Sequence, residues 1–176
     1  MSFARVRALV VVGLLAVVAL VFVVVAIVKD SQSGAGANGG CPEGWPLADV
    51  ALRERKDVKL NVINATDRPG LAGEVADEFR NRQFQVKKVT DQKKQVDRVA
   101  VLRFGPKGVG SAHLLLAYFL GNADTKFEVE RQDDTVDVVL GSDFQQLATT
   151  TEVNQSLGDL GSPTAPPGTC PMPVGK

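Results

Sequence analysis

The stretch VKLNVINATDRPGLA, at residues 58–72, contains the clearest signal of the fold. Its opening VKLNVI alternates apolar and polar side chains and is rich in β-branched residues, which is typical of a β-strand. Residues 64–70 then combine turn-forming side chains with Pro69, a residue that fits the first turn of a helix. Thr66 or Asp67 is expected to cap that helix. The stretch therefore predicts a strand, a tight turn and a helix.

Similar patterns continue toward the C-terminus. Leu71, Val75 and Phe79 mark one face of the first helix, which is expected to end near Gln83. Further strands are expected at residues 84–90, 98–104, 126–131 and 135–140, with a second helix at residues 109–120. The turn at residues 132–134 is expected to join the last two strands as a β-hairpin.

The order of these elements, β-α-β-β-α-β-β, determines the predicted fold class. Right-handed crossovers with the helices on one face of the sheet predict an α/β protein, more narrowly an α+β two-layer sandwich that resembles the ferredoxin-like split βαβ. One domain is expected, over residues 55–147, and it is long enough to bury a single modest core.

An unbroken apolar run, ALVVVGLLAVVALVFVVVAIV, occupies residues 8–28. As a helix it would rise about 31 Å, close to the roughly 30 Å hydrocarbon core of a bilayer. Arg5 and Arg7 precede the run, so residues 1–7 are expected to stay cytoplasmic and the rest to lie outside. We expect a single-pass transmembrane helix in the plasma membrane. A cleaved secretory signal is the alternative, because Ala35-Gly36-Ala37 offers a cleavage site.

The regions that flank the predicted domain have compositions of their own. Residues 29–54 include the Gly/Ser-rich stretch SQSGAGANGG and are expected to form a tether. Residues 148–176 are expected to form a Pro-rich tail, which is extended and poorly ordered over residues 158–176. Gly13, Ala16 and Ala19 form a stripe of small residues in the apolar run. Such stripes can pack helices together, so the sequence leaves open whether the chain forms a homo-oligomer.

Two cysteines, Cys41 and Cys170, bracket the domain. Neither has a second cysteine or a histidine at metal-ligand spacing, so we expect no metal and no other cofactor. Thiols outside the membrane normally oxidise, which predicts a Cys41–Cys170 disulfide. Two unpaired thiols or an intermolecular bridge are the alternatives.

Charge and side-chain chemistry narrow the range of functions. The 20 basic and 20 acidic residues balance, which argues against nucleic-acid binding. The single histidine, His113, lies in an apolar helical segment and is far from any motif for nucleophilic catalysis. We therefore expect a protein that is not an enzyme.

Three segments resemble the LytR C-terminal domain family. They are Leu60–Thr66 with Pro69–Ala72, Val101–Gly108 with its Phe-Gly-Pro turn, and VVLGSDF at residues 138–144. The N-terminal anchor and flanking cysteines look most like stand-alone actinobacterial members of this family. The family usually has a glycine where this chain has Arg82-Gln83. The resemblance implies a role in the cell envelope at the outer face of the plasma membrane, and it supplies no active site.

The best candidate for ligand binding is the first turn of the domain. Asn64, Thr66 and Arg68 are expected at the N-terminus of a helix, where backbone N–H groups favour anions, and Arg68 adds a charge suited to phosphate or carboxylate. Asp143 follows the last strand and is expected near the same end of the sheet. Plain turn and cap chemistry is the alternative explanation of these residues.

Together these features predict a non-enzymatic, single-pass membrane protein whose outer domain binds envelope proteins or an anionic glycopolymer or lipid. It would act as a scaffold that maintains the cell envelope or cell wall. The first alternative is an enzyme, or an accessory subunit of one, that acts on cell-wall glycopolymers. The second is an extracytoplasmic ligand sensor.

Overall fold

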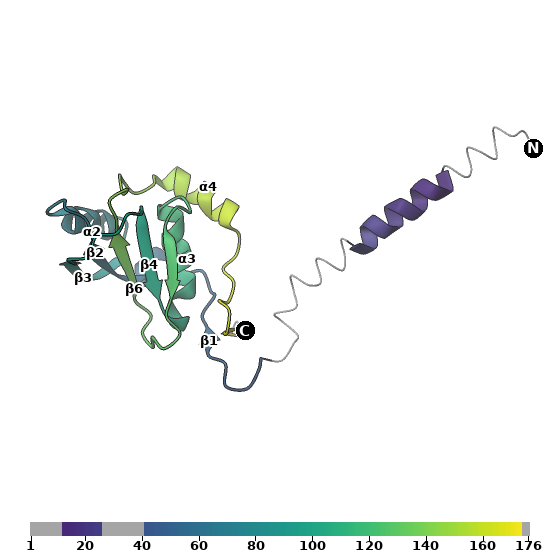
Figure 1. Ribbon diagram of the computed structural model, residues 1–176, viewed down its shortest axis with the longest axis horizontal. Helices are drawn as coiled ribbons and strands as arrows, with labels where there is room; N and C mark the ends of the chain where they lie inside the picture. The colour runs from purple at the N-terminus through teal and green to yellow at the C-terminus, as the bar shows by residue number, and fades with distance from the viewer. Residues whose placement is uncertain (1–11, 26–40, 174–176) are drawn as a thin grey trace, which may run out of the picture. The chain divides into compact units, whose positions relative to one another are not determined.

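The computed structural model describes residues 12–25 and 41–173 (Figure 1). Residues 12–25 are helical. The rest of the predicted span 8–28 and the Gly/Ser-rich stretch 31–40 lie outside the described residues. Among the residues that are described, no helix is both long enough and apolar enough to span a bilayer. The chain divides into two compact units, Met1–Pro42 and Glu43–Lys176, and the second contains the sheet.

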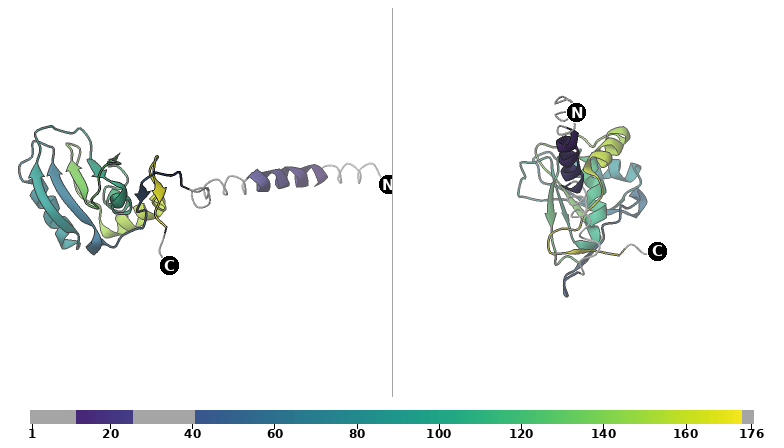
Figure 2. Two further views of the ribbon diagram at one scale, coloured as in Figure 1. Left: turned by 90° about the horizontal axis from the view of Figure 1, so that it is seen from below. Right: turned by 90° about the vertical axis from the view of Figure 1, so that its right-hand side faces the viewer.

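The second unit is built on a five-stranded sheet with strand order β3-β2-β6-β4-β5 (Figures 1 and 2). The strands are β2 (Lys59–Asn64), β3 (Gln85–Asp91), β4 (Ala100–Phe104), β5 (Asp124–Phe127) and β6 (Val136–Leu140). β2 pairs in parallel with β3 and β6, while β4 pairs in parallel with β5 and antiparallel with β6. The predicted mixed α/β class is confirmed.

Two helices connect the parallel pairs: α2 (Leu71–Asn81) lies between β2 and β3, and α3 (Val109–Tyr118) lies between β4 and β5. Because β2 and β4 run in opposite directions, two right-handed crossovers place both helices on the same face of the sheet. Alternate strand residues are buried against them in one core. That core includes Leu60, Val62, Leu102, Val136 and Val138 from the strands, and Val75, Phe79, Ala112 and Leu115 from the helices.

The strand order differs from the ferredoxin-like split βαβ that the sequence predicts. In a split βαβ another strand separates the two parallel strands, whereas β2 and β3 are direct neighbours, as are β4 and β5. The last strand, β6, instead enters between the two β-α-β units and joins them. The predicted split βαβ is therefore wrong, because hydrophobic alternation fixes which face a strand buries and leaves its neighbours open.

The predicted hairpin between residues 126–131 and 135–140 is also wrong. β5 ends at Phe127 and pairs with β4 alone, and the chain then returns past β4 to form β6 in the middle of the sheet. Gly105 permits this route, because a Cβ added there would lie 2.3 Å from the Arg131 carbonyl oxygen. A side chain at position 105 would push the returning loop away.

A cluster of polar side chains holds β6 in its central position. The Asn61 amide donates to Asp137 Oδ1 at 2.7 Å, and Arg131 donates to both Asp137 oxygens at 2.9 and 3.2 Å. Burial opposes the charge on Arg131, but its hydrogen bonds to Asp137 and Asp133 raise the pKa of the guanidinium above its usual range. These contacts join β2, β6 and the returning loop on the face opposite the helices.

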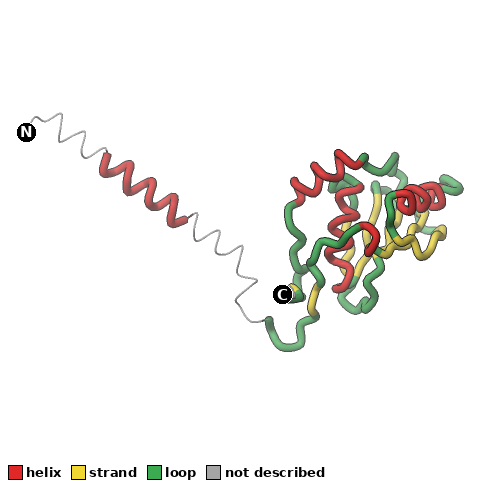
Figure 3. Tube along the Cα trace, turned by 180° about the vertical axis from the view of Figure 1, so that it is seen from behind, coloured by secondary structure: helices red, strands yellow, loops and turns green. Residues whose placement is uncertain are grey.

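Segments that the sequence assigns to the tether and the tail also belong to the folded unit. β1 (Leu47–Ala48) pairs in parallel with β7 (Cys170–Pro171), so the chain before the sheet lies beside its C-terminal part (Figure 3). Ala48 is fully buried. The helix α4 (Thr150–Leu160) follows the sheet and contacts α3. The predicted Pro-rich tail thus contains a helix that the sequence did not predict, and the expected poor order is wrong for residues 158–160.

Candidate functional site

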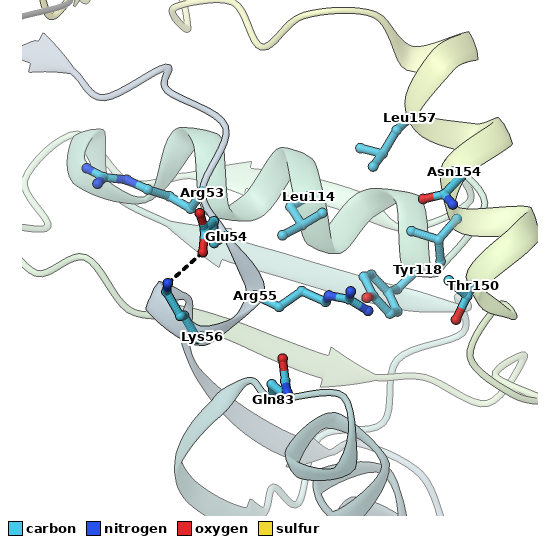
Figure 4. Close-up of a pocket in the computed structure, with 11 residues that line it drawn as sticks. Arg53, Glu54, Arg55, Lys56, Gln83, Leu114, Tyr118, Thr150, Asn154 and Leu157 are labelled. Carbon is cyan, nitrogen blue, oxygen red and sulfur yellow. Dashed lines mark ion pairs between the residues drawn. The ribbon is translucent and has the colours of Figure 1, made fainter.

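A pocket of about 390 Å³ lies beside α3 and α4 (Figure 4). Its walls come from the 3₁₀ turn η1 (Arg55–Asp57) with the residues just before it, from the turn after α2, and from both helices. The lining residues are Arg53, Glu54, Arg55, Lys56, Gln83, Leu114, Tyr118, Thr150, Val153, Asn154 and Leu157. This volume lies within the range of small-molecule sites, roughly 300–1,000 Å³.

The helices present their pocket residues at helical spacing. Leu114 and Tyr118 are four residues apart on α3, and Val153 and Leu157 are four apart on α4, so each pair shares a face. The start of α4 is fixed by a capping box in which Thr149 and Glu152 bond to each other's backbone N–H groups. Leucine and valine side chains from both helices therefore form an apolar floor on one side of the pocket.

The rim of the pocket carries an excess of positive charge. Lys56 Nζ lies 2.8 Å from Glu54 Oε2, and this contact lowers the pKa of Glu54 and raises the pKa of Lys56. Arg53 pairs with Asp49. For Arg55, in contrast, the described residues supply no side-chain hydrogen bond or ion pair. Figure 4 shows its guanidinium reaching across the pocket toward Tyr118.

Tyr118 is a largely buried residue whose hydroxyl group belongs to the lining of this pocket. The residue is 2% exposed, and its ring packs against Phe84 and Phe79 with centroid distances of 5.1 and 6.0 Å. The described residues provide no hydrogen-bond partner for its hydroxyl, which belongs to a side chain that lines the pocket. The hydroxyl oxygen itself is not fully buried, so solvent or a ligand can reach it.

The ligand site predicted from the sequence forms a tight turn in the structure. Asn64 is 3% exposed, and its amide nitrogen donates to the Arg68 carbonyl and to Asp91 Oδ1, both at 2.9 Å. Its oxygen accepts from the Thr66 N–H at 3.0 Å and from the Thr66 hydroxyl at 2.7 Å. Asn64 and Thr66 therefore satisfy each other and shape the loop.

The expected capping of α2 by Thr66 or Asp67 is wrong. The N-cap is Gly70, which has a φ of +82° and makes no side-chain cap bond. Thr66 instead accepts the Arg68 N–H at 3.0 Å, a local turn that competes with helix capping. The Pro69 ring precedes the helix and does not occupy its first turn.

Arg68 and Asp143 lie at the same end of the sheet, after β2 and β6 respectively. Arg68 Nη1 donates to the Phe144 carbonyl at 3.2 Å, one residue beyond Asp143. Asp143 accepts a hydrogen bond of 3.4 Å from Ser142, and its backbone N–H donates to the Arg98 carbonyl. The structure thus brings Arg68 to the segment that contains Asp143, and ligand binding by these residues stays a prediction.

The cysteines and the histidine have structural contacts. Cys41 and Cys170 are both disulfide-bonded and are the two cysteines of the chain, so the predicted Cys41–Cys170 disulfide is confirmed. His113 Nε2 lies 2.9 Å from the Gly161 carbonyl oxygen, and this hydrogen bond connects α3 to the end of α4. Over residues 12–25 and 41–173, no group of three or more acidic, histidine or cysteine side chains could hold a metal ion.

The pocket itself was not predicted from the sequence. Two signals were available: the charged run Arg53-Glu54-Arg55-Lys56, and the spacing of Val153, Leu157 and Leu160, which is helical and apolar on one face. The charged run crosses the expected boundary between tether and domain, and the apolar spacing lies in the expected tail. Only the packing of α4 against α3 brings them together.

Comparisons with known proteins identify the family. Residues 57–144 match the family model described as LytR cell envelope-related transcriptional attenuator, LytR_C. The chain is 28% identical over 118 residues to the cell envelope integrity protein of Mycobacterium tuberculosis, an alignment that covers 65% of this chain and 54% of that protein. The chain thus spans about half the length of this curated relative.

A solved structure supports the same relationship. The soluble domain of a conserved hypothetical secreted protein from Mycobacterium marinum is similar with a TM-score of 0.51 and 26% sequence identity. The similarity covers 73% of this chain and 82% of that domain. The family match, the relatives and the strand–turn–helix at residues 58–72 agree, and the chain belongs to the LytR C-terminal domain family.

Proposed function

We propose that this chain is a non-enzymatic, single-pass membrane protein whose extracytoplasmic domain binds a component of the cell envelope and so helps to maintain its integrity. The family and the mycobacterial relative associate the domain with the cell envelope. The disulfide and the secreted neighbour support a location outside the cytoplasm. The apolar run at residues 8–28 supports the anchor.

The pocket beside α3 and α4 is the observation that carries the binding role. It combines an apolar floor with two polar groups, Arg55 and Tyr118, that have no partner among the described residues. The Arg55 guanidinium and the Tyr118 hydroxyl make no hydrogen bond within the described part of the chain, and both residues line the same space. A protein that served only as a spacer would have no need for such a pocket.

The turn at Asn64 and Arg68 is a second, smaller part of this proposal. Arg68 keeps donors beyond the one that bonds to Phe144, and it lies beside a shallow hollow of about 120 Å³. Asn64 and Thr66 would position Arg68, and Asp143 would limit the approach of anions at this end of the sheet. The alternative is that these residues only stabilise the turn.

Complementation of a strain that lacks the gene tests the proposed function. The full chain should restore normal envelope permeability to a dye, and so should a chain in which Arg80→Gln changes an exposed charge away from the pocket. Arg55→Gln should restore less. A chain with residues 8–28 replaced by a cleavable secretory signal should also fail, because the domain would no longer be held at the membrane.

Two results would contradict the proposal. Full complementation by the secreted, unanchored domain would refute the role of the anchor. Full complementation by the Arg55→Gln chain, at an equal protein level in immunoblots, would refute the role of the pocket.

A further inference from the structure

We propose that the pocket binds an anionic amphiphile, a phosphate or carboxylate group that carries an apolar chain. This inference rests on the proposed function and names the ligand class of the same site. The anionic group would accept hydrogen bonds from Arg55 and from the Tyr118 hydroxyl. The apolar chain would lie on Leu114, Val153 and Leu157.

The charge distribution favours an anion. Arg53 and Lys56 at the rim already have the acidic partners Asp49 and Glu54, whereas Arg55 has none among the described residues. A guanidinium donates to phosphate or carboxylate through a planar fork, which gives such pairs both strength and geometry. An anion beside Arg55 would therefore complete the charge pairing of this rim.

The second donor lies deeper in the same pocket. The Tyr118 side chain is held by the Phe79 and Phe84 rings and by Arg82, whose guanidinium carbon lies 5.4 Å from the ring centre. This packing holds the ring in place, and the hydroxyl oxygen stays accessible to solvent at the pocket. A ligand oxygen that reached it would take the place of water as its hydrogen-bond partner.

The floor of the pocket favours an apolar chain over a sugar. Leu114 and Val153 are 6% and 4% exposed, and they border the pocket together with Leu157. A sugar ring would need an open aromatic face, but the Tyr118 ring packs against Phe79 on α2 and against Phe84, which lies just before β3. A ligand with one charged end and one apolar end matches both the positively charged rim and the apolar floor of the pocket.

The ligand could come from the bilayer, as a lipid headgroup with the start of its chain, or from a soluble amphiphile outside the membrane. Both sources present the same chemistry, which is an anionic group joined to an apolar chain. If residues 8–28 form the anchor, the domain belongs to a membrane-bound chain, which makes lipid headgroups one source of the ligand.

Tyr118 provides a single reporter for the test, because the chain contains one tyrosine. The full chain, with its tyrosine ring labelled by ¹³C, would be placed in phosphatidylcholine nanodiscs and titrated with hexyl phosphate while NMR follows the ring resonance. We expect a saturable shift. Inorganic phosphate and hexanol should each bind at least roughly tenfold more weakly, since each lacks one half of the recognition.

Matched variants assign the binding to the pocket. Arg55→Gln should weaken hexyl phosphate binding by roughly tenfold, the effect of losing one charge-assisted hydrogen bond. Lys87→Gln removes the same charge from the exposed part of β3 and should change the affinity by less than about twofold. Tyr118→Phe, measured by calorimetry, should weaken binding by roughly threefold to tenfold.

A second titration distinguishes the two sources of the ligand. If nanodiscs that contain phosphatidylglycerol shift the Tyr118 resonance as hexyl phosphate does, the source is the bilayer. If they do not, while hexyl phosphate binds, the source is a soluble amphiphile. Both results support the ligand class.

Three results would overturn the inference: no saturable shift with hexyl phosphate, equal losses of affinity in Arg55→Gln and Lys87→Gln, or inorganic phosphate binding as tightly as hexyl phosphate. The complementation experiment stays independent of this test. An envelope role that survived without hexyl phosphate binding would refute the ligand class alone.

Discussion

The guanidinium carbon of Arg82 lies 5.4 Å from the centre of the Tyr118 ring, and Arg82 Nη1 donates to the Ala148 carbonyl at 2.5 Å. One side chain at the end of α2 thus contacts both α3 and the segment that leads into α4. The side chain is 24% exposed, so these contacts are partly shielded from water.

Replacing Arg82 should therefore destabilise the domain. Arg82→Ala is expected to lower the free energy of unfolding by about 1–3 kcal/mol, because it removes a charged hydrogen bond and a cation–π contact. Arg80→Ala removes an exposed ion pair with Asp77 and should cost less than about 0.5 kcal/mol. Urea unfolding followed by circular dichroism measures the free energy of unfolding of both variants. Equal losses of stability in the two variants would contradict the stabilising role of Arg82.

Gln83, in the turn after α2, adopts the left-handed region with a φ of +71°. A side chain costs about 1 kcal/mol in this conformation. Gln83→Gly is therefore expected to raise the free energy of unfolding by about that amount. Gln83→Ala retains a Cβ and should give no gain in the same urea experiment. A gain with alanine would show that the glutamine side chain, not the backbone angle, is unfavourable.

The turn after β2 contains both structural residues and a candidate ligand residue, and two substitutions distinguish them. Asn64→Ala would leave the Thr66 N–H and the Asp91 carboxylate without their partner, and it is expected to cost about 2–3 kcal/mol. Arg68→Ala removes one side-chain bond to the Phe144 carbonyl and should cost less than about 1 kcal/mol. Arg68→Ala should also weaken retention of the folded protein on purified anionic envelope fractions. Unchanged retention in that pull-down would leave only the turn role for Arg68.

The capping box of α4 predicts a pH dependence of stability. Hydrogen bonds from the Thr149 backbone and side chain lower the pKa of Glu152 below its ordinary value of 4.5. A lowered pKa in the folded state means that the stabilisation is complete above the unfolded value and is lost as pH falls through the folded value. Thermal unfolding between pH 6 and pH 3 should therefore show a steeper decline for the natural chain than for Glu152→Gln. If the melting temperatures of the two chains fell in parallel with pH, the capping box would not contribute to the pH dependence of stability.

Reduction of the Cys41–Cys170 disulfide should lower the melting temperature. Closing a loop of this length is worth up to about 5 kcal/mol in the chain-entropy model. The effect should be smaller than that limit, because Cys41 lies just outside the second compact unit. Calorimetry with and without dithiothreitol measures it, and a Cys41→Ser, Cys170→Ser double variant should no longer respond to the reductant. No change on reduction would show that the bond does not constrain unfolding.

Local sequence patterns predicted most elements of the sheet and its two covering helices. Residues 58–63 were expected as a strand and form β2 at Lys59–Asn64, and residues 109–120 were expected as a helix and form α3 at Val109–Tyr118. The periodicity of apolar residues is a short-range property, so it is present in the sequence before folding. The same holds for the cysteine pair, whose oxidation follows from its compartment.

The candidate pocket could not be predicted in this way. The helical spacing of Val153 and Leu157 predicts an apolar face, but it does not say that this face meets Leu114 and Tyr118 on α3. The sequence predicted an anion site at Asn64 from residue types that are equally suited to forming turns. In the structure, the Asn64 side chain is occupied by bonds to Thr66, Arg68 and Asp91.

The sequence by itself predicted most of the local elements around the sheet, a Cys41–Cys170 disulfide with alternatives left open, and the resemblance to the family. Only the tertiary structure decided that β6 lies between β2 and β4, because strand pairing depends on contacts between residues far apart in the chain. Gly105 gives room for the returning loop, and the bonds of Asp137 to Asn61 and Arg131 hold β6 in place. The pocket is likewise a tertiary product, because its floor and rim come from segments that are separate in the sequence and meet only when α4 packs on α3.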